Sequence, residues 1–431
     1  MGMIIVLLIV LGIAHRITTA EQRAQLLQTV VVSLGQLKEA AKRRPECEPF
    51  LDALVARTPK ALLTPTLVAL NVAIFVFMLF GSGALGDTKT LVGWGANFAP
   101  RTTNGEWWRV VTSMFVHGGL FQLLFNVAAL FQIGLILERL VGRFTVAVVY
   151  VGAGIFATLL SLSSYPLAVS MGASGAVFGL YGLLIASCVW GEFYPSSMTI
   201  PLITLKRLVP TAALFILYNL ASESLPFTAE LGGLFVGLVS GLVLARGVGE
   251  STPADRQVGT VMGVLAAIAV AFAIPLRGIA DVRPEIERLI SVEDRTATDY
   301  KAAVDRFKTG RINADALVQM IDSTIMPELE AADARLKALG RVPAEHQPLV
   351  ASAEEYLRLR DESWRLRAEG LRNINMPVPR TLGKGDRTAN QSLRLRAEAR
   401  YRTDLRTRAK AEETERASLV AFKKMRSADQ K

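Results

Sequence analysis

The sequence is poor in cysteine and histidine. Of its 431 residues, two are cysteine and three are histidine. Cys47 lies in a polar stretch and Cys188 in an apolar one, so the two thiols are expected at different depths and no disulfide is expected. So few ligands exclude a structural zinc site, and nothing in the sequence points to a metal or an organic cofactor. A reaction that needs an imidazole has only His15, His117 and His346 to choose from.

Charge and hydropathy are unevenly distributed along the chain. Hydrophobic residues make up 51% and the mean hydropathy is +0.35, yet the last third of the sequence is densely charged. This contrast predicts a membrane part and a water-soluble part. The net charge of +10 can indicate nucleic-acid binding, but no aromatic–basic recognition motif is present, and a membrane protein with basic cytoplasmic loops has the same excess. We therefore expect the lipid bilayer, and not nucleic acid, as a partner.

Seven apolar segments recur in the first two thirds of the chain. Each approaches the roughly 20 residues that a helix needs to cross a bilayer. They cover about 62–80, 117–137, 144–161, 174–190, 208–220, 229–244 and 258–275. The predicted fold class is an all-α membrane protein, with a bundle of six transmembrane helices and an additional seventh span.

Lysine and arginine are concentrated in alternate connections between these segments. They follow the second segment, precede the fifth and separate the last two, as Arg139, Arg143, Lys206, Arg207, Arg246 and Arg256. The connections 163–172 and 222–228 contain neither residue type. Because cytoplasmic loops carry the basic excess, residue 174 is predicted near the external face and the region after residue 277 outside the cytoplasm. We expect a multi-pass integral protein, with a bacterial inner membrane as its location.

Three regions follow from this pattern. Residues 1–60 begin with a short apolar stretch that has no basic residue before it, interpreted as an uncleaved anchor or a segment in the membrane interface, and continue as an amphipathic linker. Residues 61–277 form the predicted transmembrane domain. Residues 278–431 form a predicted soluble, charged helical domain.

The soluble region has the pattern of amphipathic helices. Helices are predicted over 284–289, 296–308, 315–339 and 350–371, followed by a linker at 377–385 and a charged tail that is either a helix or a disordered arm. The last of these helices has an apolar stripe that includes Leu357, Trp364 and Ala368, which indicates core packing or a partner helix. These helices therefore offer a surface for a protein partner.

Several short motifs lie on three of the apolar segments and on the loop before the second. The motifs are Trp108-Arg109, His117, Gln122 and Asn126, Gly172-Ala173-Ser174-Gly175, Phe178, Glu230, and Gly233, Gly237 and Gly241. In this order and spacing they resemble the rhomboid family of intramembrane serine proteases. The resemblance covers about residues 62–246 and implies a rhomboid-like bundle.

The resemblance also implies roles for these residues. Ser174, between Gly172 and Gly175, matches the family's nucleophile. Gln122 and Asn126 match a His-x-x-x-Asn motif whose side chains, together with the backbone N–H of the nucleophile, bind the oxyanion. Gln122 departs from that motif, but residues four apart share a helix face and its amide still offers N–H donors.

Three further matches lie around these residues. His117 matches a histidine at the loop–helix junction, where we expect it to fix the loop. Trp108-Arg109 matches the family's tryptophan–arginine loop motif. Phe178 stands where the family often has a tyrosine that stacks on the catalytic histidine.

Glu230 stands at the position of that catalytic histidine. Around it the sequence keeps Gly233, Gly237 and Gly241, one small-residue face for close helix packing. The packing half of the motif is thus present and the catalytic half is replaced. A carboxylate is a much weaker base than an imidazole. Two roles remain open for Glu230: a base that takes the proton of Ser174, or a hydrogen-bonding partner that holds two helices together.

Three functions follow from these alternatives. The first is a rhomboid-like protein with a degraded protease site that binds transmembrane segments of client proteins. The second is an intramembrane serine endopeptidase that uses Ser174 with Glu230. The third is a membrane-anchored scaffold that acts through its soluble helices.

Overall fold

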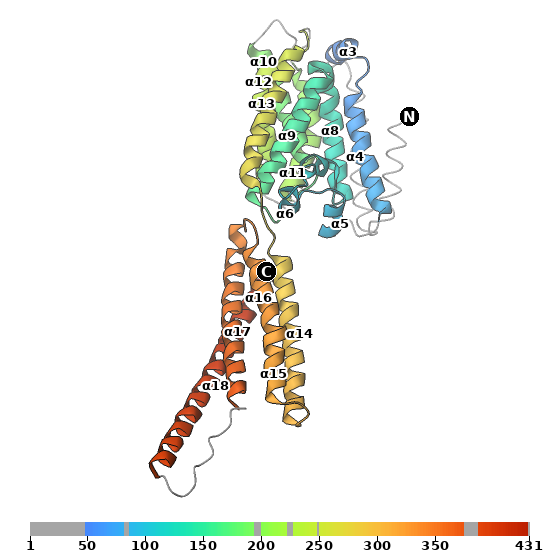
Figure 1. Cartoon of the computed structure of the whole chain (residues 1–431). Coiled ribbons are helices and arrows are strands. Elements are labelled where there is room, and N and C mark those ends of the chain that lie inside the picture. The colour runs from blue at the N-terminus through green and yellow to red at the C-terminus, as the bar shows by residue number, and fades with distance from the viewer. Residues whose placement is uncertain are drawn as a thin grey trace. The chain divides into compact units, whose positions relative to one another are not determined.

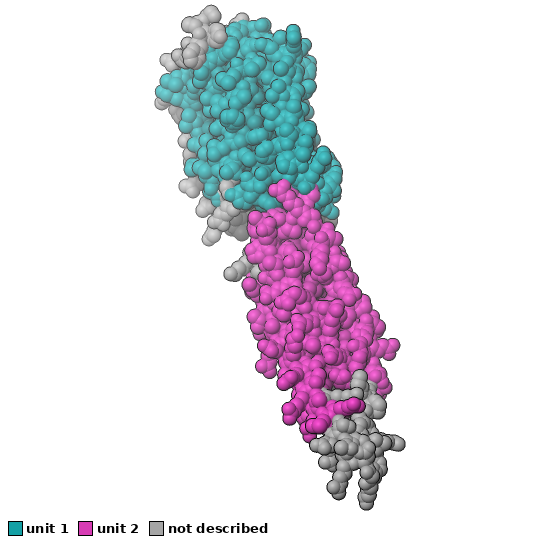
Figure 2. Space-filling model, turned by 60° about the vertical axis from the view of Figure 1, so that its left-hand side comes forward, with its two compact units in different colours: residues 1–277 teal, residues 278–431 magenta. Residues whose placement is uncertain are grey.

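The computed structural model describes residues 48–81, 86–193, 200–221, 227–247, 250–374 and 387–429. Within these ranges every regular element is helical, so the predicted all-α fold class is confirmed. The chain divides into two compact units, residues 1–277 and 278–431, called unit 1 and unit 2 (Figure 2). The predicted N-terminal anchor and the predicted linker at 377–385 lie outside the described residues. Of the predicted region 1–60, the structure describes residues 48–60.

Unit 1 is a bundle of apolar helices (Figure 1). Among the described residues, five of these helices are long and apolar enough to cross a membrane, and α10 and α12 are apolar over shorter stretches. The helices are α4 (Leu63–Phe80), α8 (Leu120–Val141), α9 (Arg143–Ser164), α10 (Ser174–Phe193), α11 (Leu202–Ala221), α12 (Thr228–Leu244) and α13 (Asp255–Ala273), preceded by the short α3 (Glu48–Arg57). Each of the seven predicted spans therefore corresponds to one helix, with ends that differ by a few residues.

The connection between α4 and α8 is itself folded. Its described part contains α5 (Thr88–Gly93), α6 (Ala99–Thr102), α7 (Arg109–Thr112) and the 3-10 turn η1 (Ser113–Phe115). An isolated bridge between Asn97 and Ser170 joins this connection to the loop that precedes α10. Two segments far apart in sequence thus meet beside the first turn of α10.

The central contact of unit 1 is between α10 and α12. A Cβ built at Gly237 would collide with the carbonyl oxygen of Gly179, and one at Gly233 with that of Gly175. The two backbones can approach this closely only because glycine occupies these positions. The glycine face of α12 therefore fixes the distance between the helices that carry Ser174 and Glu230.

A buried carboxylate joins α4 to α8. Glu138, near the end of α8, accepts hydrogen bonds from the backbone N–H groups of Leu62, Leu63 and Thr64 at 2.7–2.8 Å. These N–H groups belong to the start of α4, where a helix has no internal acceptors. A negative charge is also favourable at this end of the helix dipole. Glu138 thereby serves as the N-terminal cap of a helix far from it in sequence.

Unit 2 consists of α14 (Arg283–Lys308), α15 (Ala314–Met320), α16 (Met326–Lys337), α17 (Gln347–Ile374) and α18 (Arg387–Asp429). The break predicted between residues 289 and 296 is wrong, because α14 runs through it. Within the helix, the hydroxyls of Ser291 and Thr296 donate to the carbonyls of Arg288 and Val292. Between α15 and α16 the helix widens into a π turn, Ile321–Ile325, since Pro327 has no N–H for the carbonyl of Ser323.

A polar network lies inside unit 2. Arg360 of α17 donates to both carboxylate oxygens of Glu293 on α14, at 2.6 and 3.1 Å, and the Tyr356 hydroxyl donates to the same carboxylate. Glu293 and Arg360 are 4% and 3% exposed. Arg360 and Arg367 also form ion pairs with Glu415 of α18. The network therefore ties three helices of unit 2 together.

We expect Tyr356→Phe to destabilise unit 2 by about 1–2 kcal/mol at neutral pH, because one hydrogen bond to a buried carboxylate is lost. Burial and the neighbouring Glu293 raise the pKa of the Tyr356 phenol above its ordinary value. The stabilisation is therefore complete below about pH 10, the ordinary value, and is lost as the pH rises further. As the pH rises above about 10, hydrogen-exchange protection in α14 and α17 should therefore decrease less in the Tyr356→Phe variant than in the unmodified protein.

The matched control is Tyr401→Phe, because Tyr401 is 66% exposed. It should change neither the protection at neutral pH nor its alkaline decline. Identical alkaline curves for Tyr356→Phe and the unmodified protein would contradict the assignment.

Candidate functional site

The loop before α10 places Ser174 at the first position of that helix. Gly172 has a φ of +106°, and a Cβ there would lie 2.7 Å from Nε2 of Gln122. Its N–H donates to the carbonyl of Ser113 at 2.9 Å. Glycine is required here by both the backbone conformation and the lack of space. Ser174 consequently begins a helix whose first-turn N–H groups have no internal acceptors and suit a developing negative charge.

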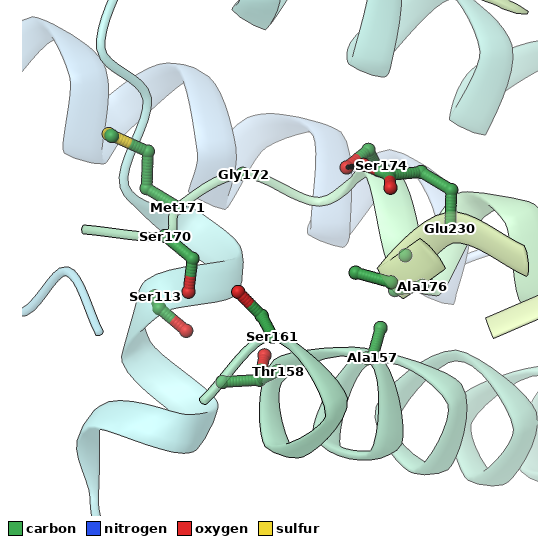
Figure 3. A pocket seen from close by; sticks show the side chains of 13 residues that line it. Ser113, Ala157, Thr158, Ser161, Ser170, Met171, Gly172, Ser174, Ala176 and Glu230 are labelled. Carbon is green, nitrogen blue, oxygen red and sulfur yellow. Dashed lines mark hydrogen bonds between the residues drawn. The ribbon is translucent and has the colours of Figure 1, made fainter. Parts of the chain in front are cut away.

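Ser174 and Glu230 are in contact. The Ser174 hydroxyl donates to Oε1 of Glu230 at 3.0 Å, across the interface between α10 and α12 (Figure 3). Ser174 is 8% exposed, and Glu230, in the first turn of α12, is partly buried. The nucleophile and the residue at the histidine position are thus brought within hydrogen-bonding distance.

A small polar pocket adjoins this pair. Its volume is about 50 Å³, which exceeds the roughly 10–15 Å³ that one water molecule needs. The hydroxyls of Ser113, Ser161 and Ser170 come from three separate segments and point into a common space, with Ser174 and Glu230 at the other end (Figure 3). The pocket can therefore hold water beside Ser174. No motif in the sequence distinguishes these three serines from others.

Gln122 and Asn126 have other hydrogen bonds. Oε1 of Gln122 accepts from the N–H of Gly118 at 2.8 Å, and its Nε2 donates to the carbonyl of Met171 at 3.1 Å. Nδ2 of Asn126 donates to the carbonyl of Gln122 at 2.7 Å. Neither residue lines the pocket. Gln122 joins the start of α8 to the loop that carries Gly172, so its amide is already engaged.

His117, Trp108 and Arg109 lie in the connection between α4 and α8. Nδ1 of the buried His117 is 3.2 Å from the carbonyl of Phe115. The buried Arg109 guanidinium donates to the carbonyls of Val92 and Ala96, pairs with Glu106 and lies 4.5 Å from the centre of the Trp108 ring. None of the three lines the pocket. They fix the folded connection around which the site is built.

Phe178 belongs to an aromatic cluster. Its ring lies edge-on to Phe227 at 5.1 Å, at the start of α12, and 5.0 Å from Phe215 of α11. Phe215 and Phe227 belong to none of the motifs in the sequence. These rings pack α10 against α11 and the start of α12, and none of the three lines the pocket.

Comparisons with known proteins agree with the motifs. The family model described as Rhomboid domain matches residues 104–247. The rhomboid protease GluP of Bacillus subtilis is 36% identical over 166 residues, which cover 38% of this chain and 31% of that protein. The putative rhomboid protease YdcA of the same species is 32% identical over 138 residues, 32% of this chain and 66% of that protein.

A third relative is the rhomboid protease AarA of Providencia stuartii, 34% identical over 134 residues, 27% of this chain and 48% of that protein. The chain thus spans from about a third to two thirds of the length of these relatives. With the apolar helices of unit 1 they confirm the predicted resemblance and a multi-pass integral membrane protein. This chain belongs to the rhomboid family.

Proposed function

We propose that this chain binds transmembrane segments of client proteins without cleaving them. The supporting observation is the pair formed by Ser174 and Glu230. A working base must take the serine proton and later return a proton to the leaving amine. Here a carboxylate accepts a hydrogen bond in the place where an imidazole would act. The hydrogen bond satisfies both polar groups and connects α10 to α12, which is a structural role.

The surroundings of the pair also support a binding function. The Gln122 amide is bonded to Gly118 and Met171, so it is not directed at an oxyanion beside Ser174. In contrast, α11 packs mainly on α8 and has three exposed leucines, Leu214, Leu217 and Leu220. An apolar helix of a client can pack on such a surface by van der Waals contact.

The alternative function is intramembrane proteolysis with Glu230 as the base. Two observations favour it: the 3.0 Å distance between the Ser174 hydroxyl and the carboxylate, and the polar pocket that can hold water beside them. Hydrolysis needs both a base in contact with the nucleophile and a water supply.

A serine-directed fluorophosphonate probe separates the two functions. The binding function predicts no labelling of Ser174, together with crosslinking of client transmembrane segments to residues introduced on α11. Labelling of Ser174 that is lost in Glu230→Gln would support the protease. A lack of both labelling and crosslinking would contradict both.

We also propose that unit 2 lies outside the cytoplasm of a bacterial cell. Arginines and lysines in alternate connections of unit 1 support this orientation, and α13 adds the seventh crossing. In spheroplasts, added protease should digest unit 2 while a cytoplasmic marker stays intact. Protection of unit 2 until the membrane is permeabilised would reverse the assignment.

A further inference from the structure

The first part of α18 is strongly basic. Residues 387–410, called the basic segment here, contain eight arginines and lysines and two acidic residues, a net charge of +6. The neighbouring helix α17 has five basic and five acidic residues and is neutral. The excess is therefore local and does not reflect the composition of unit 2 as a whole.

Three arginines of the basic segment have exposed side chains and no ion pair within the described residues: Arg396, Arg402 and Arg406. Arg408 and Lys410, further along the helix, differ from them. They pair with Asp404 and with Glu362 of α17, each at 2.8 Å. The positive charge of the three arginines is therefore left for a partner outside these residues.

Apolar side chains accompany these arginines. Leu395, Tyr401 and Leu405 are 60%, 66% and 47% exposed. At 100° per residue Leu395, Arg402 and Arg406 fall on one side of the helix, and Leu405 lies next to them. The side that packs on α17 is different and carries small residues such as Ala411 and Ser418. This side thus combines Arg402 and Arg406 with Leu395 and Leu405, whereas Arg396 and Tyr401 flank it, about 100° and 120° around the helix from Leu395.

We propose that the basic segment binds anionic phospholipid headgroups at a membrane surface. Guanidinium groups bind phosphate in two-pronged hydrogen bonds, and each basic residue near an anionic surface strengthens the binding about fivefold. The leucines and the tyrosine enter the boundary between headgroups and acyl chains, as in interfacial helices. Along the chain, unit 2 directly follows the membrane helix α13 and its terminal turn.

An acidic protein or a nucleic acid is a less suitable partner. Either would neutralise the arginines, but neither accounts for the exposed apolar side chains Leu395 and Leu405 beside Arg402 and Arg406. A bilayer accepts both kinds of side chain at its interface. The combination of charge and exposed apolar area therefore favours lipid.

The test uses the full chain held in nanodiscs of phosphatidylcholine, mixed with vesicles of phosphatidylcholine alone or with about 30% phosphatidylglycerol. Flotation should recover the nanodiscs with the anionic vesicles only, and about 0.5 M salt should weaken the binding through screening. The triple variant Arg396→Glu, Arg402→Glu, Arg406→Glu should bind at least about 100-fold more weakly. The control variant Lys301→Glu, Arg306→Glu, Arg311→Glu has the same charge change on and just after α14 and should bind nearly as well as the unmodified chain.

A second triple variant replaces the same three arginines with glutamine, which removes their charges without reversing them. It should bind the anionic vesicles about 100-fold more weakly than the unmodified chain. An unchanged circular dichroism spectrum would show that this loss is not caused by misfolding. Equal flotation with neutral and anionic vesicles would overturn the proposal. So would equal losses in the α14 control. Binding to polyglutamate or to an oligonucleotide, without binding to anionic vesicles, would overturn it in favour of a macromolecular partner.

Discussion

Glu230→His is expected to convert this chain into a measurable protease. The substitution places an imidazole beside the Ser174 hydroxyl, where a carboxyl oxygen now lies at 3.0 Å. General bases contribute about 10²–10⁴-fold to such reactions. Cleavage of a transmembrane reporter in proteoliposomes should therefore rise by at least about 10²-fold over the unmodified chain. The gain should be incomplete, since Gln122 still bonds to Met171.

Adding Gln122→His to Glu230→His tests that last point. One oxyanion donor is worth about 10²–10³-fold, so the double variant should be faster than the single one. Ser174→Ala in the same background is the control and should abolish all cleavage. The opposite pattern, in which the unmodified chain cleaves and Glu230→His slows it, would show that Glu230 is the working base.

Gly237→Leu is expected to unfold the core of unit 1. Even a Cβ at this position would overlap the carbonyl oxygen of Gly179, and a leucine side chain needs far more room. Because backbone atoms cannot rotate out of the way, α10 and α12 must separate. Overpacking of a core costs about 1–3 kcal/mol, and here the loss of the whole helix contact adds to it. We expect a lower melting temperature in detergent and little folded protein after purification.

Gly259→Leu is the matched control, since a Cβ at Gly259 of α13 meets no atom within 4 Å. It should leave the melting temperature nearly unchanged. A milder probe, Gly237→Ala, should weaken the fold less but still disturb the contact between Ser174 and Glu230. If Gly237→Leu melted like the control, the close approach of α10 and α12 would be refuted.

The helices of unit 1 could be predicted because the bilayer sets the length of each apolar segment. No such external length exists in unit 2. The sequence pattern there predicts two helices, over 284–289 and 296–308, where the structure has the single helix α14. Nothing in the local sequence shows that the carboxylate of Glu293 is buried. Its partner Arg360 lies 67 residues away, and only the tertiary fold brings them together.

The same distinction applies to the site. Ser174 and Glu230 could be singled out because each stands in a glycine-rich block whose spacing is informative. Ser113, Ser161 and Ser170 could not, since each alone resembles a hydroxyl that bonds to its own backbone. Their common pocket depends on the approach of three segments. The engagement of Gln122 was likewise hidden, because Met171 is 49 residues away.

The cap that Glu138 provides has a consequence for how the chain enters the membrane. The start of α4 is completed only by a side chain that is synthesised 74 to 76 residues later, near the end of α8. Until that residue emerges, three N–H groups need water as their acceptor and are kept at the aqueous boundary. The first two spans are therefore expected to settle as a joined hairpin, closed at the face from which the polypeptide is delivered.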